Sequence, residues 1–311
     1  MHDFLTSRRA RITPEQAGMP TYGEKRRVPG LRREDVASLA GVSFDYYARL
    51  ERGNLSGVSS VVLEALARAL QLDEAERQHL FDLAKAASVP ASRSRAAKPP
   101  VTRVRPAVLS ILDGMIGTPA YVRNARLDIL AANDLCLALY DGVLVRDQLP
   151  FNLARFVFLD PYAKAFFLDW DTIALDMVAA LRTQAGRDPS DRGLSDLIGE
   201  LATRSDAFAA RWARHDVRLH RTARKRLANR VVGEIELTGD ALDLAGDGLT
   251  MIAYSAEPGS QAEDQLKLLA TWSATVRPRA SQTAGTSPPS AGPGSALAGN
   301  RPAGSADVET G

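Results

Sequence analysis

Cysteine is nearly absent from this chain of 311 residues, since Cys136 is the single one. One thiol cannot form an internal disulfide framework, and it excludes a cysteine-rich zinc site. Because Cys136 lies in the apolar run LCLALY, we expect it to be buried as a small hydrophobic side chain. The four histidines have no zinc-ligand spacing, so no metal site is predicted.

Long apolar runs are missing as well. No uninterrupted apolar stretch reaches the roughly 18 residues that a membrane helix needs, so we expect no membrane partner. Residues 1–15, MHDFLTSRRARITPE, lack the apolar core of a signal peptide, and the expected location is the cytoplasm. The net charge of +2 is nearly neutral, so the distribution of charge is more informative than its sum.

Motifs of common enzyme chemistry are also absent. The chain contains no GxxxxGK[ST] or GxGxxG phosphate loop and no Gly-x-Ser-x-Gly nucleophile elbow. His215 and Asp216 adjoin in sequence, but neighbouring positions on a helix or strand do not face each other. We therefore predict no catalytic residue and expect a protein that is not an enzyme.

The stretch LRREDVASLAGVSFDYYARLERG, residues 31–53, has the pattern of a helix-turn-helix. Apolar residues recur at three- and four-residue spacing from Val36 to Ala40, as one buried helix face requires. Gly41 stands where the first helix should end, because glycine adopts a left-handed C-terminal cap without a Cβ penalty. Ser43 can cap the second helix through its hydroxyl. Two short helices joined in this way place the second one in the DNA major groove.

Flanking helices complete a predicted all-α domain of five helices over residues 1–88. The first is expected from Asp3 to Ala10, and the fourth from about Ser59 to Leu70 with a clean apolar stripe. Asp73, followed three residues later by Glu76, is a capping box that starts the fifth. Up to Arg33 the chain has eight basic and three acidic residues. Such basic residues, Lys25-Arg26-Arg27 among them, can neutralise DNA phosphates, although the alternative is a solvated loop.

The order of these signals resembles the lambda-repressor/Cro type of helix-turn-helix, the XRE family. The match rests on Ala37, on Gly41-Val42-Ser43 and on Glu51-x-Gly53. The resemblance implies binding to double-stranded DNA, with base-reading positions at the start of both motif helices. This chain lacks the amides common there, so no operator sequence is carried over. The expected DNA-contacting residues are Arg32, Arg33, Ser43, Phe44, Asp45, Tyr46 and Arg49.

After residue 88 the composition changes to proline, small residues and basic residues, which predicts a linker over residues 89–105. A second domain is predicted over residues 106–275. Residues 276–311 are rich in Ser, Pro, Ala and Gly, and they cannot bury enough apolar surface to offset the entropy of ordering. We expect this tail to be disordered.

The second domain is predicted to be α+β. A hairpin comes first, several helices follow, then three strands and a last helix, an order that suggests an antiparallel sheet with helices on one side. The expected strands are residues 120–123, 127–131, 219–227, 232–237 and 249–255, and the last helix covers residues 263–274.

This layout resembles a PAS-like sensor domain, and it is similar to the ligand-binding domain of the MmyB-like regulators. The matching stretches are TPAYVRNARLDILAAN, NLARFVFLDP, WARHDVRLHRTARKRLANRVVGEIEL and AYSAEPGS. The resemblance implies a transcription regulator whose second domain holds a lipophilic small molecule of the fatty-acid type.

Residues for such a ligand are less well specified. Aromatic side chains of the helical section can line an apolar cavity, but simple core packing is the alternative. One residue of the basic band from Arg214 to Arg226 can anchor a ligand carboxylate, whereas the alternative is a row of solvent-facing positions on a strand. The candidate ligand-binding residues are Phe156, Phe167, Trp170, His215 and Arg218.

The sequence therefore predicts a homodimeric, sequence-specific DNA-binding transcription regulator that needs no cofactor and responds to a lipophilic ligand. Two alternatives stay open. In one, the helical domain is a protein-interaction module. In the other, the chain is a small-molecule enzyme with an appended helix-turn-helix.

Overall fold

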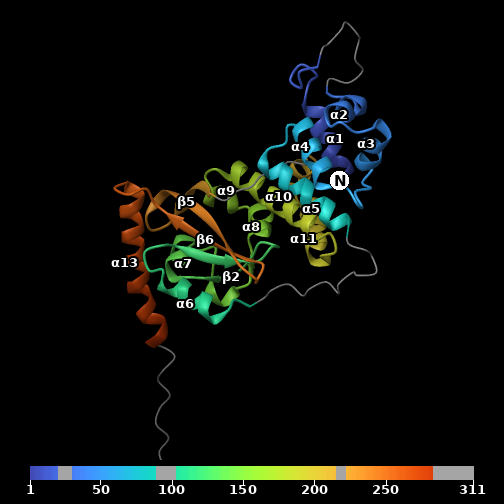
Figure 1. Ribbon diagram of the computed structural model, residues 1–311. Helices are drawn as coiled ribbons and strands as arrows, with labels where there is room; N and C mark the ends of the chain where they lie inside the picture. The colour runs from blue at the N-terminus through green and yellow to red at the C-terminus, as the bar shows by residue number, and fades with distance from the viewer. Residues whose placement is uncertain (20–29, 89–102, 215–221, 283–311) are drawn as a thin grey trace, which may run out of the picture. The chain divides into compact units, whose positions relative to one another are not determined.

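The computed structural model describes residues 1–19, 30–88, 103–214 and 222–282, with side chains up to residue 275. The first domain is helical (Figure 1). Its helices share one apolar core. The all-α, five-helix prediction is therefore confirmed. Its helices are α1 (His2–Arg11), α2 (Arg33–Leu39), α3 (Phe44–Glu51), α4 (Ser60–Ala69) and α5 (Glu74–Ala87).

The turn between α2 and α3 is built as the sequence predicts. Gly41 has φ of +65°, in the left-handed region, and its N–H donates to the Ser38 carbonyl at 3.1 Å. Ser43 is the N-cap of α3, and its hydroxyl accepts a hydrogen bond from the Tyr46 N–H at 3.2 Å. These two caps set the angle at which α3 leaves α2.

Two details of the helix ends test the predictions further. The predicted capping box forms at α5, because the Asp73 side chain accepts from the Glu76 N–H and the Glu76 side chain accepts from the Asp73 N–H. The predicted motif begins at Leu31, but α2 begins at Arg33: Leu31 is fully buried ahead of the helix, and Arg32 is the N-cap. The Arg32 N–H donates to the Asp35 carboxylate at 2.7 Å, which fixes the helix start there.

The second domain has one antiparallel sheet in the described residues, with strand order β3-β2-β1-β6-β5-β4. The predicted α+β, PAS-like fold is confirmed. Its elements are α6 (Pro106–Gly114), β1 (Ala120–Arg123), β2 (Asp128–Ala132), α7 (Asp134–Leu139), β3 (Phe151–Asn152), α8 (Leu153–Leu159), α9 (Ala163–Phe166), α10 (Trp170–Arg187), α11 (Arg192–Arg204), α12 (Asp206–Trp212), β4 (Thr222–Asn229), β5 (Gly233–Leu244), β6 (Leu249–Ser255) and α13 (Gln261–Gln282).

The sheet is covered on both faces, which corrects the expectation of helices on one side. Successive side chains of a strand point to opposite faces. On β1, Tyr121 therefore joins the main core beside α7 to α12, whereas Val122 joins a smaller core on the other face. Val108 and Leu112 of α6 close that smaller core.

Two elements are longer than predicted. β5 continues past Leu237 to Leu244, because it pairs with β4 on one side and β6 on the other, and this pairing overrides the polar run after Leu237. α13 continues to Gln282, beyond the predicted end at residue 274 and into the segment expected to be disordered. Extending an existing helix costs much less than starting one, so low apolar content does not stop it. Residues 283–311 lie outside the described part of the chain.

No helix that the structure describes is long and apolar enough to cross a membrane.

Asn133 holds the start of the second domain together. It is buried and caps α7, with its side-chain oxygen accepting from the N–H groups of Cys136 at 2.9 Å and Ala120 at 3.0 Å. Its side-chain nitrogen donates to the carbonyls of Met115 and Thr118 at 2.9 and 2.8 Å. One amide thus joins the end of α6, the start of β1 and the start of α7.

Replacing Asn133 with Ala should lower the free energy of unfolding of the second domain by roughly 2–4 kcal/mol, because several buried backbone groups lose their partners. The three tryptophans all lie in this domain, so their fluorescence during denaturation reports on it. The control is Gln148→Ala, whose side chain is exposed. Equal stability of the two variants would contradict the role given to Asn133.

Candidate DNA-binding surface and ligand site

Helix α3 has one buried face and one exposed face. Tyr47 and Leu50 point into the core of the first domain and are essentially inaccessible to solvent. Phe44, Asp45 and Arg49 are exposed on the opposite face. This is the division that a recognition helix needs, since its outer side chains must reach base edges while its inner ones hold it in place.

Arg49 and Tyr46 form a stacked pair on this exposed face. The guanidinium carbon of Arg49 lies 4.8 Å from the centroid of the Tyr46 ring. Stacking on a ring face restrains the planar guanidinium without using its N–H donors. Arg49 is therefore held ready to donate to a guanine edge or to a phosphate.

Arg32 and Arg33, at the start of α2, are both engaged with carboxylates. Arg33 Nε lies 3.2 Å from Glu51, and an Arg32 nitrogen lies 3.2 Å from Glu34. The Arg33 side chain is still 45% exposed. Because a guanidinium carries five N–H donors, this pairing leaves donors for DNA but lowers the charge offered to it. Their DNA-contacting role stays a prediction.

Glu51 is a functional residue whose role the sequence did not predict. Its carboxylate is fully buried at the end of α3 and lies 3.2 Å from Arg9 Nε of α1 and from Arg33 Nε of α2. The Thr6 hydroxyl donates to it at 3.1 Å. One buried charge thus joins α1, α2 and α3. Its burial could have been predicted from its position four residues after the inward-facing Tyr47, because residues at that spacing lie on the same face of a helix.

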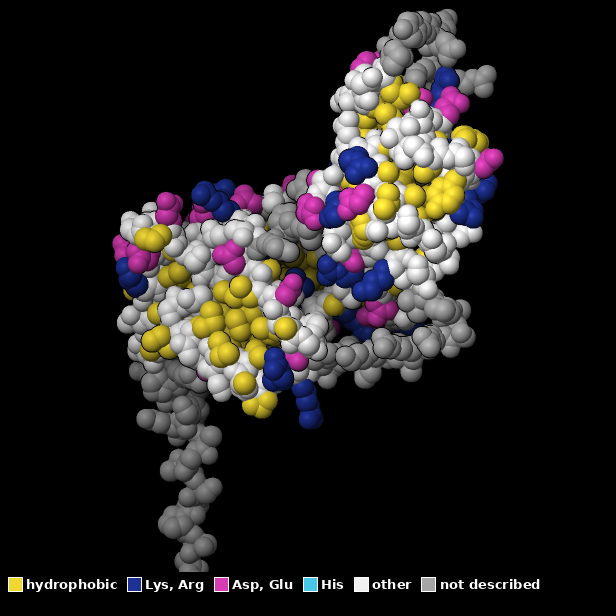
Figure 2. All heavy atoms as spheres, in the orientation of Figure 1, with side chains coloured by type: hydrophobic (Ala, Val, Ile, Leu, Met, Phe, Trp, Pro, Cys, Tyr) yellow, Lys and Arg dark blue, Asp and Glu magenta, His cyan; other side chains and the backbone are white. Residues whose placement is uncertain are grey.

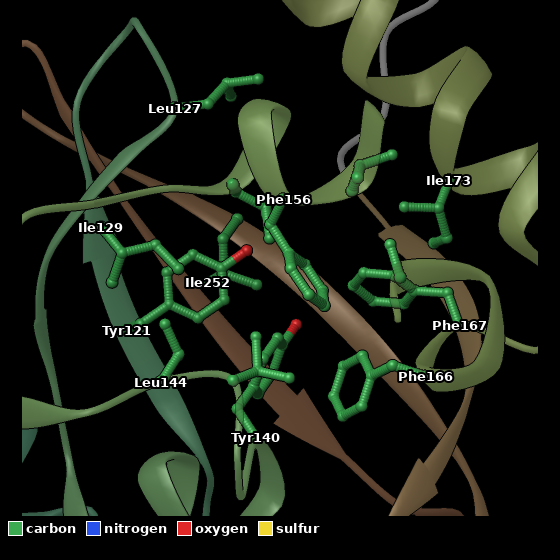
Figure 3. Close-up of a cluster of buried hydrophobic side chains, with 14 of the residues drawn as sticks. Tyr121, Leu127, Ile129, Tyr140, Leu144, Phe156, Phe166, Phe167, Ile173 and Ile252 are labelled. Atoms are coloured by element: carbon green, nitrogen blue, oxygen red, sulfur yellow. The ribbon is translucent and has the colours of Figure 1, made fainter. Parts of the chain in front are cut away.

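The predicted ligand-binding aromatics separate into two environments. Phe156 and Phe167 are buried in the main core, where their ring centroids lie 6.0 Å apart (Figure 3). Trp170 is partly buried, and its indole N–H donates to the Val157 carbonyl at 2.8 Å. The cationic ends of two side chains, Lys164 and Arg211, lie within 5.0 Å of the Trp170 ring centroid. His215 and Arg218 lie outside the described residues, as does the basic Lys25-Arg26-Arg27 segment.

A buried polar cluster lies in the same core, and it was not among the predicted ligand-binding residues. The Tyr140 and Tyr254 hydroxyls are 2.6 Å apart, and Lys225 Nζ lies 3.3 Å from the Tyr254 hydroxyl. Burial raises the pKa values of both tyrosines well above their usual range, so their hydroxyls stay protonated at neutral pH. Burial lowers the pKa of Lys225 to about 8, against an opposing effect of the Asp176 carboxylate.

A cavity of about 350 Å³ lies beside this core. Two residues of its wall, Tyr254 and Leu266, are themselves buried members of the main core. None of the predicted ligand-binding aromatics lines it. The residues around it are Gly117, Thr118, Tyr254, Ser255, Ala256, Glu263, Leu266, Lys267 and Ala270.

Comparison with known families agrees with this architecture. A family model described as the MmyB-like transcription regulator ligand binding domain matches residues 104–269, which is more than half of the chain. The chain belongs to the MmyB-like transcription regulators. A second model, described as a helix-turn-helix domain, matches residues 5–80. A search of curated proteins finds no match to the chain.

The matches confirm the predicted combination of an XRE-type helix-turn-helix with an MmyB-like ligand-binding domain. This MmyB-like regulator is therefore a DNA-binding transcription regulator that is controlled through a small-molecule-binding domain.

Removing Arg49 from the MmyB-like regulator should weaken binding to its operator while leaving the fold intact, because the side chain is exposed. We expect Arg49→Ala to cost about 1–3 kcal/mol of specific affinity if the contact is bidentate to a base. Fluorescence anisotropy with operator DNA measures the change. Arg68→Ala, an exposed arginine on α4, is the matched control. A loss of the same size in the control would show that only net charge matters.

The Glu51 carboxylate makes the first domain sensitive to acid. Burial alone would raise the pKa of Glu51, but hydrogen bonds and charge from Arg9 and Arg33 outweigh it and lower the pKa below its usual value. A depressed pKa in the folded state stabilises the fold above the unfolded pKa of about 4.3 and ceases to do so as the pH falls through the folded pKa.

Glu51→Gln should therefore destabilise the first domain at neutral pH by roughly 1–3 kcal/mol, since it removes the buried negative charge with which the partly buried Arg9 and the half-exposed Arg33 are paired. The variant should also lose the part of the acid sensitivity that Glu51 causes. Hydrogen exchange of the α3 amides between pH 3 and 7 measures both effects. Glu34→Gln, at an exposed ion pair, should match the wild-type protein. Unchanged α3 protection in Glu51→Gln is the outcome that contradicts this role.

Proposed function

We propose that this chain is a homodimeric transcription regulator whose operator affinity is set by a lipophilic, fatty-acid-like molecule in the second domain. The proposal of DNA binding rests on the two faces of α3. Phe44, Asp45 and Arg49 are exposed on one face, and the opposite face is buried in the core of the first domain. In a dimer, two such helices read half-sites about one helical turn apart.

The proposal of a lipophilic ligand is supported by the second domain's interior. Its main core is rich in aromatic side chains, and the rings of Tyr140, Phe156, Phe166 and Phe167 gather around one interior region (Figure 3). The neighbouring cavity of about 350 Å³ is within the size range of small-molecule sites. Apolar ligands gain affinity from such walls because they leave water.

The proposal of a dimer is supported by apolar residues on the surface of the second domain (Figure 2). Ile111 and Ile116, on and just after α6, are 61% and 82% exposed, and Leu109 of α6 is 37% exposed. A contiguous apolar surface marks an interaction site more often than scattered apolar residues do, and Figure 2 shows apolar side chains gathered on one face of the second domain.

Control by the ligand requires that it bind two conformations of the regulator unequally. A ligand with equal affinity for the DNA-binding and the non-binding conformation would change nothing, however tightly it bound.

Selection from a pool of random double-stranded DNA should enrich a two-fold symmetric sequence with half-sites about 10 base pairs apart, centre to centre. Affinity for the enriched sequence should fall steeply with salt, since each phosphate contact releases counterions. A scrambled version of the enriched sequence is the control. Failure to enrich any sequence would favour the reading of the helical domain as a protein-interaction module.

A further inference from the structure

We propose that Lys225, Tyr254 and Tyr140 form a buried anion-binding site that holds the carboxylate of an amphiphilic ligand. This inference rests on the proposed lipophilic ligand. It adds which chemical group of the ligand is recognised and which residues recognise it.

The alternation of β4 places Lys225 inside the domain. Lys225, Leu227 and Asn229 are buried at every second position, whereas Arg224 and Arg226, on either side of Lys225, lie on the outer face. Both arginines form salt bridges with glutamates of β5. The basic residues of β4 therefore lie in two environments. The two arginines face outward and are paired with glutamates, whereas Lys225 lies in the core.

The ammonium group of Lys225 has N–H donors that the residues described by the structure do not use. An ammonium carries three N–H donors, and one points to the Tyr254 hydroxyl at 3.3 Å. Within the described part of the chain, Lys225 has no other hydrogen bond and no salt bridge; the Tyr254 ring lies 5.3 Å from its Nζ, and the charge of the buried Asp176 carboxylate acts on it without a direct contact. A buried cation is costly unless it is paired, so this group favours an incoming anion.

The tyrosine hydroxyls add a further donor. Tyr140 and Tyr254 share one hydrogen bond of 2.6 Å, in which one hydroxyl donates and the other accepts. Whichever of the two hydroxyls is the donor, the proton of the other one is not used within the pair. The groups that carry these donors lie close together, since the Tyr140 hydroxyl and Lys225 Nζ are 2.6 and 3.3 Å from the Tyr254 hydroxyl. A carboxylate, which is an acceptor only, matches that set.

The position of the Tyr254 ring depends on Gly239. A Cβ at Gly239, on the neighbouring strand β5, would lie 2.9 Å from the Tyr254 ring. Glycine therefore leaves room for the ring beside β5, with its hydroxyl 3.3 Å from Lys225 Nζ on β4. The arrangement spans three adjacent strands and is a built feature of the sheet.

The surroundings select an anion that carries an apolar body. The ring centroids of Phe166 and Phe167 lie 5.1 and 6.4 Å from that of Tyr140. Tyr254 also belongs to the wall of the 350 Å³ cavity, together with the buried Leu266. A free inorganic anion would lose its water here without apolar contacts in return, whereas an alkyl carboxylate buries its tail as well.

The cavity offers one competing cation, Lys267. This side chain is 64% exposed and is already paired with Glu263 and Asp264 on its own helix. An exposed, paired lysine gains little from a second anion in water. Lys267 is therefore the matched alternative against which the role of Lys225 is tested.

Decanoate and decan-1-ol, which differ in charge at one end of the same tail, are the probes for calorimetric titration of the full chain. Wild-type protein should prefer decanoate. Lys225→Met should weaken decanoate binding on the order of 10- to 100-fold, as expected for losing hydrogen bonds to a charged group, and should leave decan-1-ol binding nearly unchanged. Lys267→Met should bind both probes as the wild-type protein does.

Tyr254→Phe keeps the ring, and so the packing, but removes the hydroxyl. It should weaken decanoate binding by a smaller factor, in the same direction as Lys225→Met. Thermal unfolding of each variant shows that it is folded before titration.

The pH dependence separates a charge role from a packing role. Decanoate affinity should fall above pH 8, about tenfold for each unit, as the free protein's Lys225 loses its proton, and Lys225→Met should lack this fall. The other groups that act on Lys225 are Asp176 of α10, Arg123 of β1, Cys136 of α7 and Tyr254 of β6.

The outcomes separate the site from the proposed function. Equal decanoate affinity of wild-type protein and Lys225→Met would overturn this site and leave the lipophilic ligand standing. A loss of decanoate affinity in Lys267→Met alone would show that the carboxylate binds at the surface, and it would also overturn the Lys225 site. Binding of neither probe by a wild-type protein that still binds its operator would overturn the lipophilic ligand itself.

Discussion

A charge removed from water must find partners, and this constraint shapes both domains of the regulator. Glu51 in the first domain and Lys225 in the second are both buried. Glu51 is surrounded by Arg9, Arg33 and Thr6, which satisfy its carboxylate within the fold. Lys225 has the Tyr254 hydroxyl and unused donors. One buried charge thus stabilises a structure, and the other is suited to receive a ligand.

The satisfied charge fixes how the helices beneath the candidate DNA-binding surface are joined. Glu51 ties α1 and α2 to the end of α3, while the Ser43 cap fixes its start. With both ends held, the exposed face of α3 can present the Arg49 and Tyr46 pair in one orientation. A pre-arranged surface loses less entropy on meeting DNA than a mobile one.

The sequence predicted those features that local chemistry determines. The Gly41 turn, the Ser43 cap and the Asp73–Glu76 box depend on residues a few positions apart, and all are present. The length of β5 and the second covered face of the sheet depend on pairing between distant segments, which no local pattern contains.

The ligand site shows the same limit more sharply. The segment TARKRLAN reads as a basic band, and only its position in the sheet separates the inward Lys225 from its outward arginine neighbours. Tyr254, the partner of Lys225, comes 29 residues later and Tyr140 comes 85 residues earlier. The candidates predicted from the sequence were chosen because they are aromatic or basic. The residue type alone does not indicate which side chains lie next to one another in the fold.

The central claim is that one chain couples a small molecule to DNA, and the most direct test is to measure operator affinity with and without saturating decanoate. We predict a change of the operator Kd by about 5- to 150-fold, the usual range of coupling between two sites. Operator DNA must then change the Kd for decanoate by the same factor, because coupling between two binding equilibria is reciprocal. Tight binding of both molecules with no effect of either on the other would contradict the account.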